Sequence, residues 1–554
     1  MRTTIILFSL FLLGACEDIF EVENPNSFTD GSFYKTEEDA VLATNAAYSS
    51  LQKRGLYGHF LNYVLDALSD EAEYTEFSAG IPEGFIPAVN YNANATNTVL
   101  TWTFRDLYNG VYRANAVLDN VADMDIDVEI KNRCLGEAHF LRGLYHWHAI
   151  MLFGPEVPIV LRTPADSDDF FNGLTPAGEA WAAITNDFKR AKELLPTVDA
   201  YRGTGDLGRA SKGAATGYLG KTYLYRASLD PVANSAEMYQ NAADEFVQII
   251  NQEVGTYNLT TNFRDNHTNE NEHNIESLFE VAFAFTAEIP ANNQSFVWSV
   301  DVDPENRLTE SRLRAQNAGM FRDIGGRWYN IEPSQKLYDE FERGTSGEII
   351  DPRAPMTLWS PGGAFFVDTS EEDTLYYEDI DWNGRFGWRK FEYDFDVRDC
   401  CDLDGNGWVD DINQRLLRYS DVLLMYAEAL SNGASGSGSP QQYLNIVRSR
   451  ANQKVDEQAH LWYSTDFSGA DREDLPSVED LISQNGWSIQ DAIRHERMVE
   501  LSGELHRWFD IVRWNRGALE LTEKQDFTNF DGASDYYWPI PFSEFNRNPN
   551  ISGG

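Results

Sequence analysis

The sequence predicts a mainly α-helical protein, in which paired helices form a frame that carries an irregular, loop-rich lobe with a few short strands. Apolar residues recur every three or four positions through much of residues 33–250 and again through 412–554. This spacing places them on one face of a helix. Between residues 251 and 411 the rhythm largely disappears, while Gly, Pro, Asn, Asp and Trp become frequent. The 554 residues, 42% of them hydrophobic, can bury a large core.

The clearest helix covers residues 134–152, and the same rhythm over 498–512 predicts a single helix there. Further helices are expected over 38–52, 181–195, 210–227, 242–250 and 422–430. Helix pairs joined by short loops can stack as an α-solenoid, in the manner of tetratricopeptide repeats. The sequence itself contains no clean repeat period that would establish this stacking.

The N-terminus has the features of a bacterial export signal. An apolar run at residues 5–13 is too short to span a bilayer as a mature helix. It ends in Leu-Gly-Ala-Cys, which looks like a lipobox, where the thiol of Cys16 accepts diacylglycerol. We expect residues 1–15 to be a lipoprotein signal peptide and 16–32 to be the lipidated Cys and a polar tether. The alternative is an ordinary signal peptide that ends near a coincidental Cys.

The charge balance bears on the class of ligand. The chain has 44 Lys and Arg against 88 Asp and Glu, a net charge of -44. Such a field repels phosphate backbones, so we expect no nucleic-acid partner. Neutral oligosaccharides and peptides remain possible ligands. The alternative is that the negative charge only keeps the protein soluble.

The cysteines other than Cys16 do not predict a disulfide framework, because their number is odd. Cys134 lies on an apolar helical stripe and is expected in the core. The adjacent Cys400 and Cys401 could form a vicinal disulfide or remain free thiols.

Aromatic side chains in irregular segments are the candidates for ligand binding, since a glycan needs flat apolar faces with amides and carboxylates at the rim. Two segments qualify, a loop predicted over 77–101 and the lobe at 251–411. The candidate ligand residues are Phe85, Tyr91 and Asn92 in the first segment and Trp298, Trp328 and Tyr329 in the second. Packing within the protein is the alternative role for each aromatic residue.

Residues 402–413 resemble an EF-hand-type calcium loop. Oxygen ligands fall at the first, third, fifth and ninth positions, a glycine at the sixth provides the turn, and the seventh offers its carbonyl. The predicted calcium ligands are Asp402, Asp404, Asn406, Trp408, Asp410 and Asn413. Asn413 replaces the bidentate Glu usual at position twelve, so we expect weak, structural calcium binding. The alternative is an Asp/Gly turn before a helix that begins near Gln414.

Motifs along the whole chain resemble the SusD/RagB family. The most specific are Ala-His-Phe-Leu-Arg-Gly at 138–143, Leu-Phe-Gly-Pro-Glu-Val-Pro at 152–158, Arg-Tyr-Ser-Asp at 418–421 and Arg-Trp-Phe-Asp at 507–510. Leu505 departs from the family, which usually has Gly at this position. Charged residues from Glu496 to Asp510 stand three or four apart and are expected to form ion pairs along one helix rather than a catalytic dyad.

The resemblance implies four tetratricopeptide-like helix pairs, with a less regular lobe that carries the ligand. It also implies a partner, a SusC-like TonB-dependent outer-membrane transporter over which the protein acts as a hinged lid. We therefore expect a lipid-anchored protein of the outer-membrane surface that captures glycans for import, has no organic cofactor and is not an enzyme. The alternatives are a RagB-like protein that binds oligopeptides and a surface glycoside hydrolase.

Overall fold

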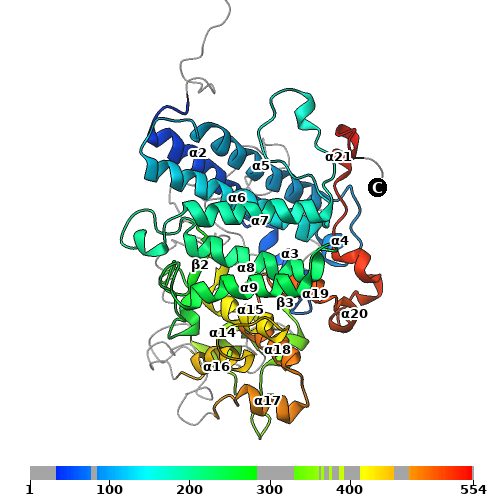
Figure 1. The fold of residues 1–554 in the computed structure, drawn as a ribbon. Helices are drawn as coiled ribbons and strands as arrows, with labels where there is room; N and C mark the ends of the chain where they lie inside the picture. Colours follow the sequence, from blue (N-terminus) through cyan, green and yellow to red (C-terminus); the bar gives the residue numbers. More distant parts are fainter. Residues whose placement is uncertain are drawn as a thin grey trace, which may run out of the picture.

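The structure is a computed structural model, and it describes residues 33–75, 84–283, 330–360, 364–366, 374–376, 386–391, 412–453 and 473–551. Helices dominate these residues, and the strands are short (Figure 1). The mainly helical fold class predicted from the sequence is confirmed. Among the same residues, no helix has both the length and the apolar character needed to cross a membrane.

Eight helices form the frame. They are α2 (Glu37–Ser49), α5 (Thr98–Val121), α6 (Val128–Phe153), α7 (Ala177–Leu194), α8 (Lys212–Leu229), α9 (Ser235–Ile250), α15 (Tyr419–Ser431) and α16 (Pro440–Ala451). Each packs on the next in this order, so that they stack from the blue to the yellow part of Figure 1. Four consecutive pairs result, α2 with α5, α6 with α7, α8 with α9 and α15 with α16. This arrangement confirms the predicted solenoid of tetratricopeptide-like pairs.

Side-chain caps set where several frame helices begin. The side-chain oxygens of Asn97, Asp127 and Ser211 accept backbone N–H groups in the first turns of α5, α6 and α8. These N–H groups have no partner within the helix, so each cap stabilises its helix by about 1 kcal/mol. At its other end α6 stops at Gly154, whose φ of 95° only glycine adopts easily.

Helix α6 lies at the centre of the core, and it is buried along most of its length after Cys134. The burial of Cys134 confirms the sequence prediction. Gly110 of α5 permits close packing between α5 and α6, because a Cβ atom at this position would overlap the ring of Tyr145. On the opposite side of α6, the Trp147 ring packs edge-on against Phe509, which belongs to the C-terminal third of the chain. The core is therefore continuous from the N-terminal helices to the C-terminal ones.

Further helices connect and cover the frame. They are α3 (Leu61–Leu68), α4 (Phe85–Val89), α13 (Gln335–Glu340), α14 (Ala354–Thr357), α17 (Val478–Asn485), α18 (Ile489–Leu501), α19 (Arg507–Trp514), α20 (Gly517–Glu520) and α21 (Phe542–Arg547). Single 3-10 turns are η1 (Ser50–Gln52), η3 (Asp168–Phe170), η4 (Val198–Ala200), η5 (Phe263–His267), η12 (Phe527–Asn529) and η13 (Gly532–Tyr536).

The strands of the described residues pair into antiparallel two-stranded sheets. The pairs are β1 (Ala72–Tyr74) with β3 (Ile331–Pro333), β2 (Ser277–Val281) with β8 (Gln414–Arg418), β4 (Leu358–Trp359) with β7 (Gly387–Trp388), and β5 (Ala364–Phe366) with β6 (Thr374–Tyr376). In the first pair, Ala72 lies opposite Pro333 and Tyr74 opposite Ile331. Two of these sheets join segments more than a hundred residues apart in the chain.

The prediction of a single helix over residues 498–512 is wrong, because the chain turns between α18 and α19. Gly503 and Leu505 both have a φ of 71°. This left-handed conformation cannot continue a right-handed helix. The apolar rhythm nevertheless persists across the turn, since both helices face the same core, and periodicity alone therefore did not reveal the break.

Two further predictions are wrong in detail. The predicted loop over 77–101 contains helix α4, and α5 already begins at Thr98. In α4, Phe85 lies one turn before Ala88 and Val89, and all three are buried. A pattern of three residues is too short to be detected in the sequence. No helix begins near Gln414, because residues 414–418 form strand β8, buried on both faces. A short buried run of this kind fits a strand and a helix equally well.

Candidate ligand-binding site

The β1·β3 sheet brings together the two segments whose aromatic residues were predicted to bind ligand. Strand β1 leads into residues 76–83, and residues 284–329 lead into β3. Beyond the sheet, the backbone N–H of Thr75 donates to the carbonyl of Asn330 across 3.0 Å. Residues 76–83 therefore begin beside the point where residues 284–329 end. Trp298, Trp328 and Tyr329 lie outside the described residues, and Tyr329 directly precedes Asn330 in the sequence.

The three candidate ligand residues of the first segment differ in how far they are buried. Phe85 is 1% exposed and packs in the core, so its ring is not presented to a ligand in this structure. Tyr91 is half-buried, its hydroxyl donates to the Leu68 carbonyl across 2.6 Å, and its ring stacks on Trp508. Asn92 is exposed. Contact of Tyr91 and Asn92 with ligand remains a prediction.

A C-terminal segment that sequence reasoning missed lies beside Tyr91. Phe530, which follows η12, packs edge-on against the Tyr91 ring with centroids 5.2 Å apart. The Tyr74 hydroxyl donates to the carboxylate of Asp526, and the Asn529 amide donates to the Asn90 carbonyl across 3.2 Å. Figure 1 shows this C-terminal region, with α20, on the side of the molecule that carries α4.

Together with Tyr91, the missed residues form a group of rings with polar side chains beside them. Three half-buried rings, Tyr74, Tyr91 and Phe530, are accompanied by the carboxylate of Asp526 and the amide of Asn529. From the sequence, residues 412–554 were expected to belong only to the helical frame. The aromatic density of residues 527–538 outside long helices was the signal that could have identified Phe530.

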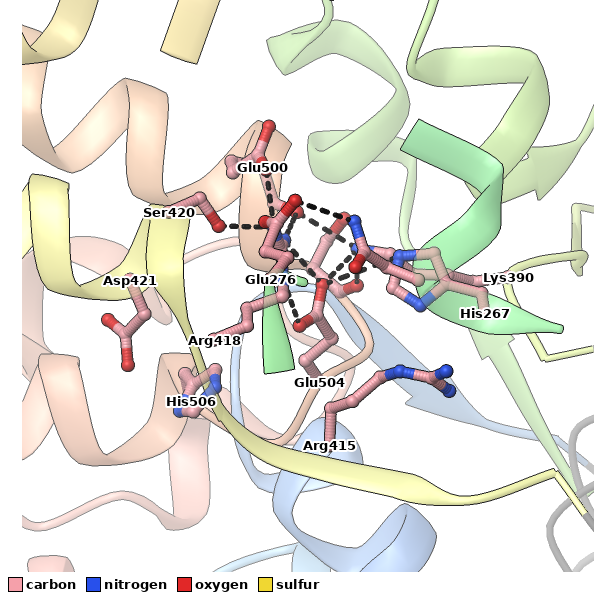
Figure 2. Close-up of polar contacts among 12 residues, drawn as sticks. His267, Glu276, Lys390, Arg415, Arg418, Ser420, Asp421, Glu500, Glu504 and His506 are labelled. Atoms are coloured by element: carbon pink, nitrogen blue, oxygen red, sulfur yellow. Dashed lines mark hydrogen bonds and ion pairs between the residues drawn. The ribbon is translucent and has the colours of Figure 1, made fainter. Parts of the chain in front are cut away.

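A buried charge network connects the lobe to the C-terminal helices, and Figure 2 shows it converging on Arg418 at the end of β8. The Arg418 guanidinium lies 2.7 Å from a carboxylate oxygen of Glu276 on β2 and 2.6 Å from one of Glu500 on α18. It also contacts Glu504 at 2.7 Å, and the same carboxylate accepts from Lys390 at 2.7 Å. These five side chains are all fully buried.

This network cannot act as a pair of catalytic carboxylates. Burial alone raises the pKa of Glu276, but the charges of Arg450 and Arg418 outweigh it and lower the pKa to about 2. The pKa of Glu500 is held low in the same way. Both groups are ionised at neutral pH, and so neither has a proton to donate to a glycosidic oxygen. Burial also keeps both of them from any sugar.

The ion pairs predicted along one helix are wrong in most of their partners, although Arg497 does bind Asp510 at 2.7 Å across the turn between α18 and α19. Glu496 of α18 binds Arg353 and Arg448, which come from other elements, and Arg497 binds Asp421 of α15 at 2.7 Å. These charged side chains point into the core, where they link elements distant in sequence. The spacing of three and four residues predicted the correct face of the helix but, apart from the Arg497–Asp510 pair, not the partners of its charged side chains.

The calcium prediction can be examined at one ligand within the described residues, Asn413. Its amide nitrogen donates to Glu280 across 2.9 Å, and its Oδ1 accepts the backbone N–H of Phe283 across 2.8 Å. An amide oxygen has a second lone pair. Asp402, Asp404, Asn406, Trp408 and Asp410 lie outside the described residues. Calcium binding thus stays a prediction, and the loop adjoins strand β8 rather than a helix.

One other group of potential metal ligands is an ion-pair cluster. The side chains of Glu342, His495 and Glu496 converge within reach of one ion. However, the Arg448 guanidinium bridges Glu342 at 2.6 Å and Glu496 at 2.9 Å. Burial lowers the pKa of His495, but hydrogen bonds to Glu340 and Glu342 outweigh this effect and raise it to about 10. A protonated imidazole has no lone pair for a metal.

Two family models match the chain. The model described as the SusD family covers residues 294–553, and one described as starch-binding associating with outer membrane covers residues 65–224. The chain belongs to the SusD-like family. SusD-like protein P2 of Formosa agariphila is 26% identical, over 99% of this chain and 98% of that protein.

Solved structures agree with this SusD-like fold. A laminarin-binding SusD-like protein superposes with a TM-score of 0.68 and 25% identity, over 94% of this SusD-like chain and 99% of its own. Surface glycan-binding protein A from Bacteroides thetaiotaomicron, solved with laminarihexaose, gives a TM-score of 0.66 at 19% identity, over 92% of this chain and 98% of its own. The second likeness concerns the fold alone.

Proposed function

We propose that this SusD-like protein binds glycans at the cell surface without cleaving them. The observation that carries the proposal is the β1·β3 sheet, from which both predicted ligand segments emerge beside the half-buried rings of Tyr74, Tyr91 and Phe530. Flat rings bordered by amide and carboxylate groups suit the C–H faces and hydroxyls of sugars. The related structure described as a laminarin-binding SusD-like protein supports the same ligand class.

The proposal extends to location and partner. Lipidation at Cys16 would hold the protein at the outer membrane, in keeping with the family description of association with that membrane. The bound glycan would then pass to a SusC-like TonB-dependent transporter. Calcium in the loop 402–413 would stabilise the segment before β8 and take no part in binding the glycan.

The test is retention and cleavage by the purified mature protein. On native affinity gels containing laminarin or soluble starch, we expect retarded migration in at least one gel and no release of reducing ends after prolonged incubation. Tyr74→Ala should weaken retention about tenfold or more, because a stacked ring contributes roughly 1–3 kcal/mol. The matched control is Tyr112→Ala, which removes a ring that is 51% exposed on α5.

Three outcomes would contradict the proposal. Release of reducing ends would make the protein a hydrolase. Retention of peptides with no retention of any polysaccharide would favour the oligopeptide-binding alternative. Equal losses for Tyr74→Ala and Tyr112→Ala would show that the ligand site is elsewhere.

A further inference from the structure

The β1·β3 sheet contains only two three-residue strands, and a sheet of this size has little stability of its own. Its orientation must therefore come from contacts with the rest of the protein. One end of the sheet, at Tyr74 and Ile331, carries both candidate ligand segments. The opposite end, at Ala72 and Pro333, is where such contacts can fix it.

Lys524, in the C-terminal part of the chain, contacts the end of the sheet at Ala72 and Pro333. Its buried ammonium donates to the carbonyls of Ala67, Ser69 and Ala72 across 2.8, 2.9 and 2.7 Å. Ala67 lies in the last turn of α3, and Ser69 directly follows the helix. The carbonyls of these two residues therefore have no hydrogen-bond partner within the helix. The ammonium group of Lys524 therefore caps the C-terminal end of α3 and also fixes Ala72, the first residue of β1.

Asp70, between α3 and β1, makes the second connection. Arg507 of α19 binds its two carboxylate oxygens at 2.7 and 2.8 Å. Lys336 of α13 binds the same carboxylate at 2.6 Å and also contacts Glu520 of α20 at 3.0 Å. Because α13 directly follows β3, this cluster fixes both strands to the same C-terminal helices.

Backbone contacts complete the attachment. The Ser334 N–H donates to the Glu71 carbonyl across 2.8 Å, and the Ser334 hydroxyl donates to the Asp70 carbonyl across 2.6 Å. The Glu71 carboxyl accepts the Gly503 N–H across 2.9 Å. Every one of these contacts lies at the end of the sheet away from the ligand segments.

We propose that Lys524, together with Asp70 and Lys336, positions the ligand-facing end of the β1·β3 sheet, where Tyr74 lies, without contacting the ligand. The inference rests on the proposed function and goes beyond it, since it assigns binding roles to buried residues of the C-terminal part. Fixing one end of the sheet keeps Tyr74, at the other end, in place before the ligand arrives, and this lowers the entropy cost of binding. Disruption of this attachment should therefore weaken binding more than it weakens the fold.

The experiment compares Lys524→Met with Lys221→Met. Lys221 is also buried and paired with an acid, Asp421 at 3.4 Å, but it lies in frame helix α8. Hydrogen exchange measured by mass spectrometry needs no ligand. We expect exchange at residues 72–75 and 330–334 to be at least tenfold faster in Lys524→Met, and unchanged there in Lys221→Met. On affinity gels with laminarin or starch, only Lys524→Met should lose about tenfold or more in affinity.

Lys524→Arg retains a cationic donor and should recover most of both properties. If Lys524→Met does not fold, Lys336→Met removes the half-buried link to Asp70 and is measured in its place. Unchanged exchange in the sheet would overturn the inference, and so would faster exchange with unaltered glycan affinity. Wild-type protein that binds no polysaccharide would instead refute the proposed function, while the exchange data would still decide whether Lys524 fixes the sheet.

Discussion

Leu505 turns the chain between α18 and α19 in a conformation that glycine adopts most easily. Its φ is 71°, and its side chain is 4% exposed within the core. A left-handed backbone costs a leucine roughly 1–2 kcal/mol, whereas burial of the side chain contributes about 1.5–3 kcal/mol. The two effects explain how this chain can depart from the glycine that the family usually has here.

Replacement of Leu505 separates these two effects. Leu505→Ala and Leu505→Gly both lose the packing, but only the glycine variant relieves the backbone strain. We expect both variants to be less stable than the wild type, with Leu505→Gly more stable than Leu505→Ala by about 1 kcal/mol. Denaturant unfolding measures the difference. A glycine variant less stable than the alanine variant would contradict the strain argument.

His495 gives the protein a pH-dependent contribution on the alkaline side. Its raised pKa of about 10 reflects hydrogen bonds to Glu340 and Glu342, with the Trp487 ring packed nearby. Because the folded pKa exceeds the unfolded value of 6.5, the contribution is fully present below pH 6.5. It is lost as pH rises towards 10.

His495→Gln should therefore be less stable than the wild type at pH 6 by on the order of a few kcal/mol. The difference between the two proteins should shrink steadily towards pH 10. Thermal or denaturant unfolding across this range provides the measurement. A difference that is constant with pH would show that His495 is uncharged in the folded state.

At the scale of elements, the frame depends on close approach between neighbouring helices. Gly110 of α5 faces the Tyr145 ring of α6, which is fully buried and cannot move aside. A Cβ atom at Gly178 of α7 would instead crowd only the side chain of Val232, a residue that is 77% exposed and can move aside, and would make ordinary contact with Asp230 at 3.8 Å. The same Gly-to-Ala change should thus have opposite effects at the two sites.

Gly110→Ala is expected to destabilise the protein by about 1–3 kcal/mol, since overpacking outweighs the helix propensity of alanine. Gly178→Ala, as the matched control, should be neutral or stabilising by up to about 1 kcal/mol. Chemical denaturation of both variants tests this. Equal effects would mean that the α5–α6 contact tolerates an extra methyl group.

The calcium loop is an element whose prediction rests on the sequence. If its dissociation constant is about 1 mM, as in extracellular modules, 10 mM calcium should stabilise the protein by about 1.4 kcal/mol. Asp404→Ala should abolish the gain, while Asp301→Ala, outside the loop, should retain it. Melting curves with calcium and with chelator measure the shift. An identical response of wild type and Asp404→Ala would exclude calcium from this loop.

At the scale of the whole molecule, the chain combines a net charge of -44 with a core that contains many ion-paired arginines. Arg353, Arg418 and Arg497 are each at most 2% exposed and bound to carboxylates. Breaking one such buried pair leaves an uncompensated charge, which costs about 3–5 kcal/mol. The ion pairs therefore join the lobe, the frame and the C-terminal helices into one core.

The membrane anchor is also a property of the whole molecule. Cys16→Ala expressed in a bacterium that processes lipoproteins should shift the protein from the membrane fraction to the soluble fraction, because the acyl chains supply the membrane affinity. Metabolic labelling with palmitate should disappear in parallel. Cys134→Ala, which alters a buried thiol in the core, is the control. Membrane retention of Cys16→Ala would contradict the lipid anchor.

The sequence by itself determined the helical frame, because burial of one helix face leaves a rhythm that can be read locally, as in residues 134–152 and 181–195. It also marked the two segments that meet at the β1·β3 sheet. It did not reveal α4 or β8, since a few buried residues carry too little periodic signal, nor the turn at Leu505, which interrupts no apolar pattern.

Only the tertiary structure decided which charges meet. Arg418 and Glu276 are 142 residues apart, and Lys524 contacts carbonyls near Ala67 across 457 residues. Nothing local to either residue specifies such a partner, because an ion pair in the core depends on how distant elements pack. For the same reason, Phe85 could be identified as an aromatic residue in an irregular segment, whereas its burial depended on the surrounding helices.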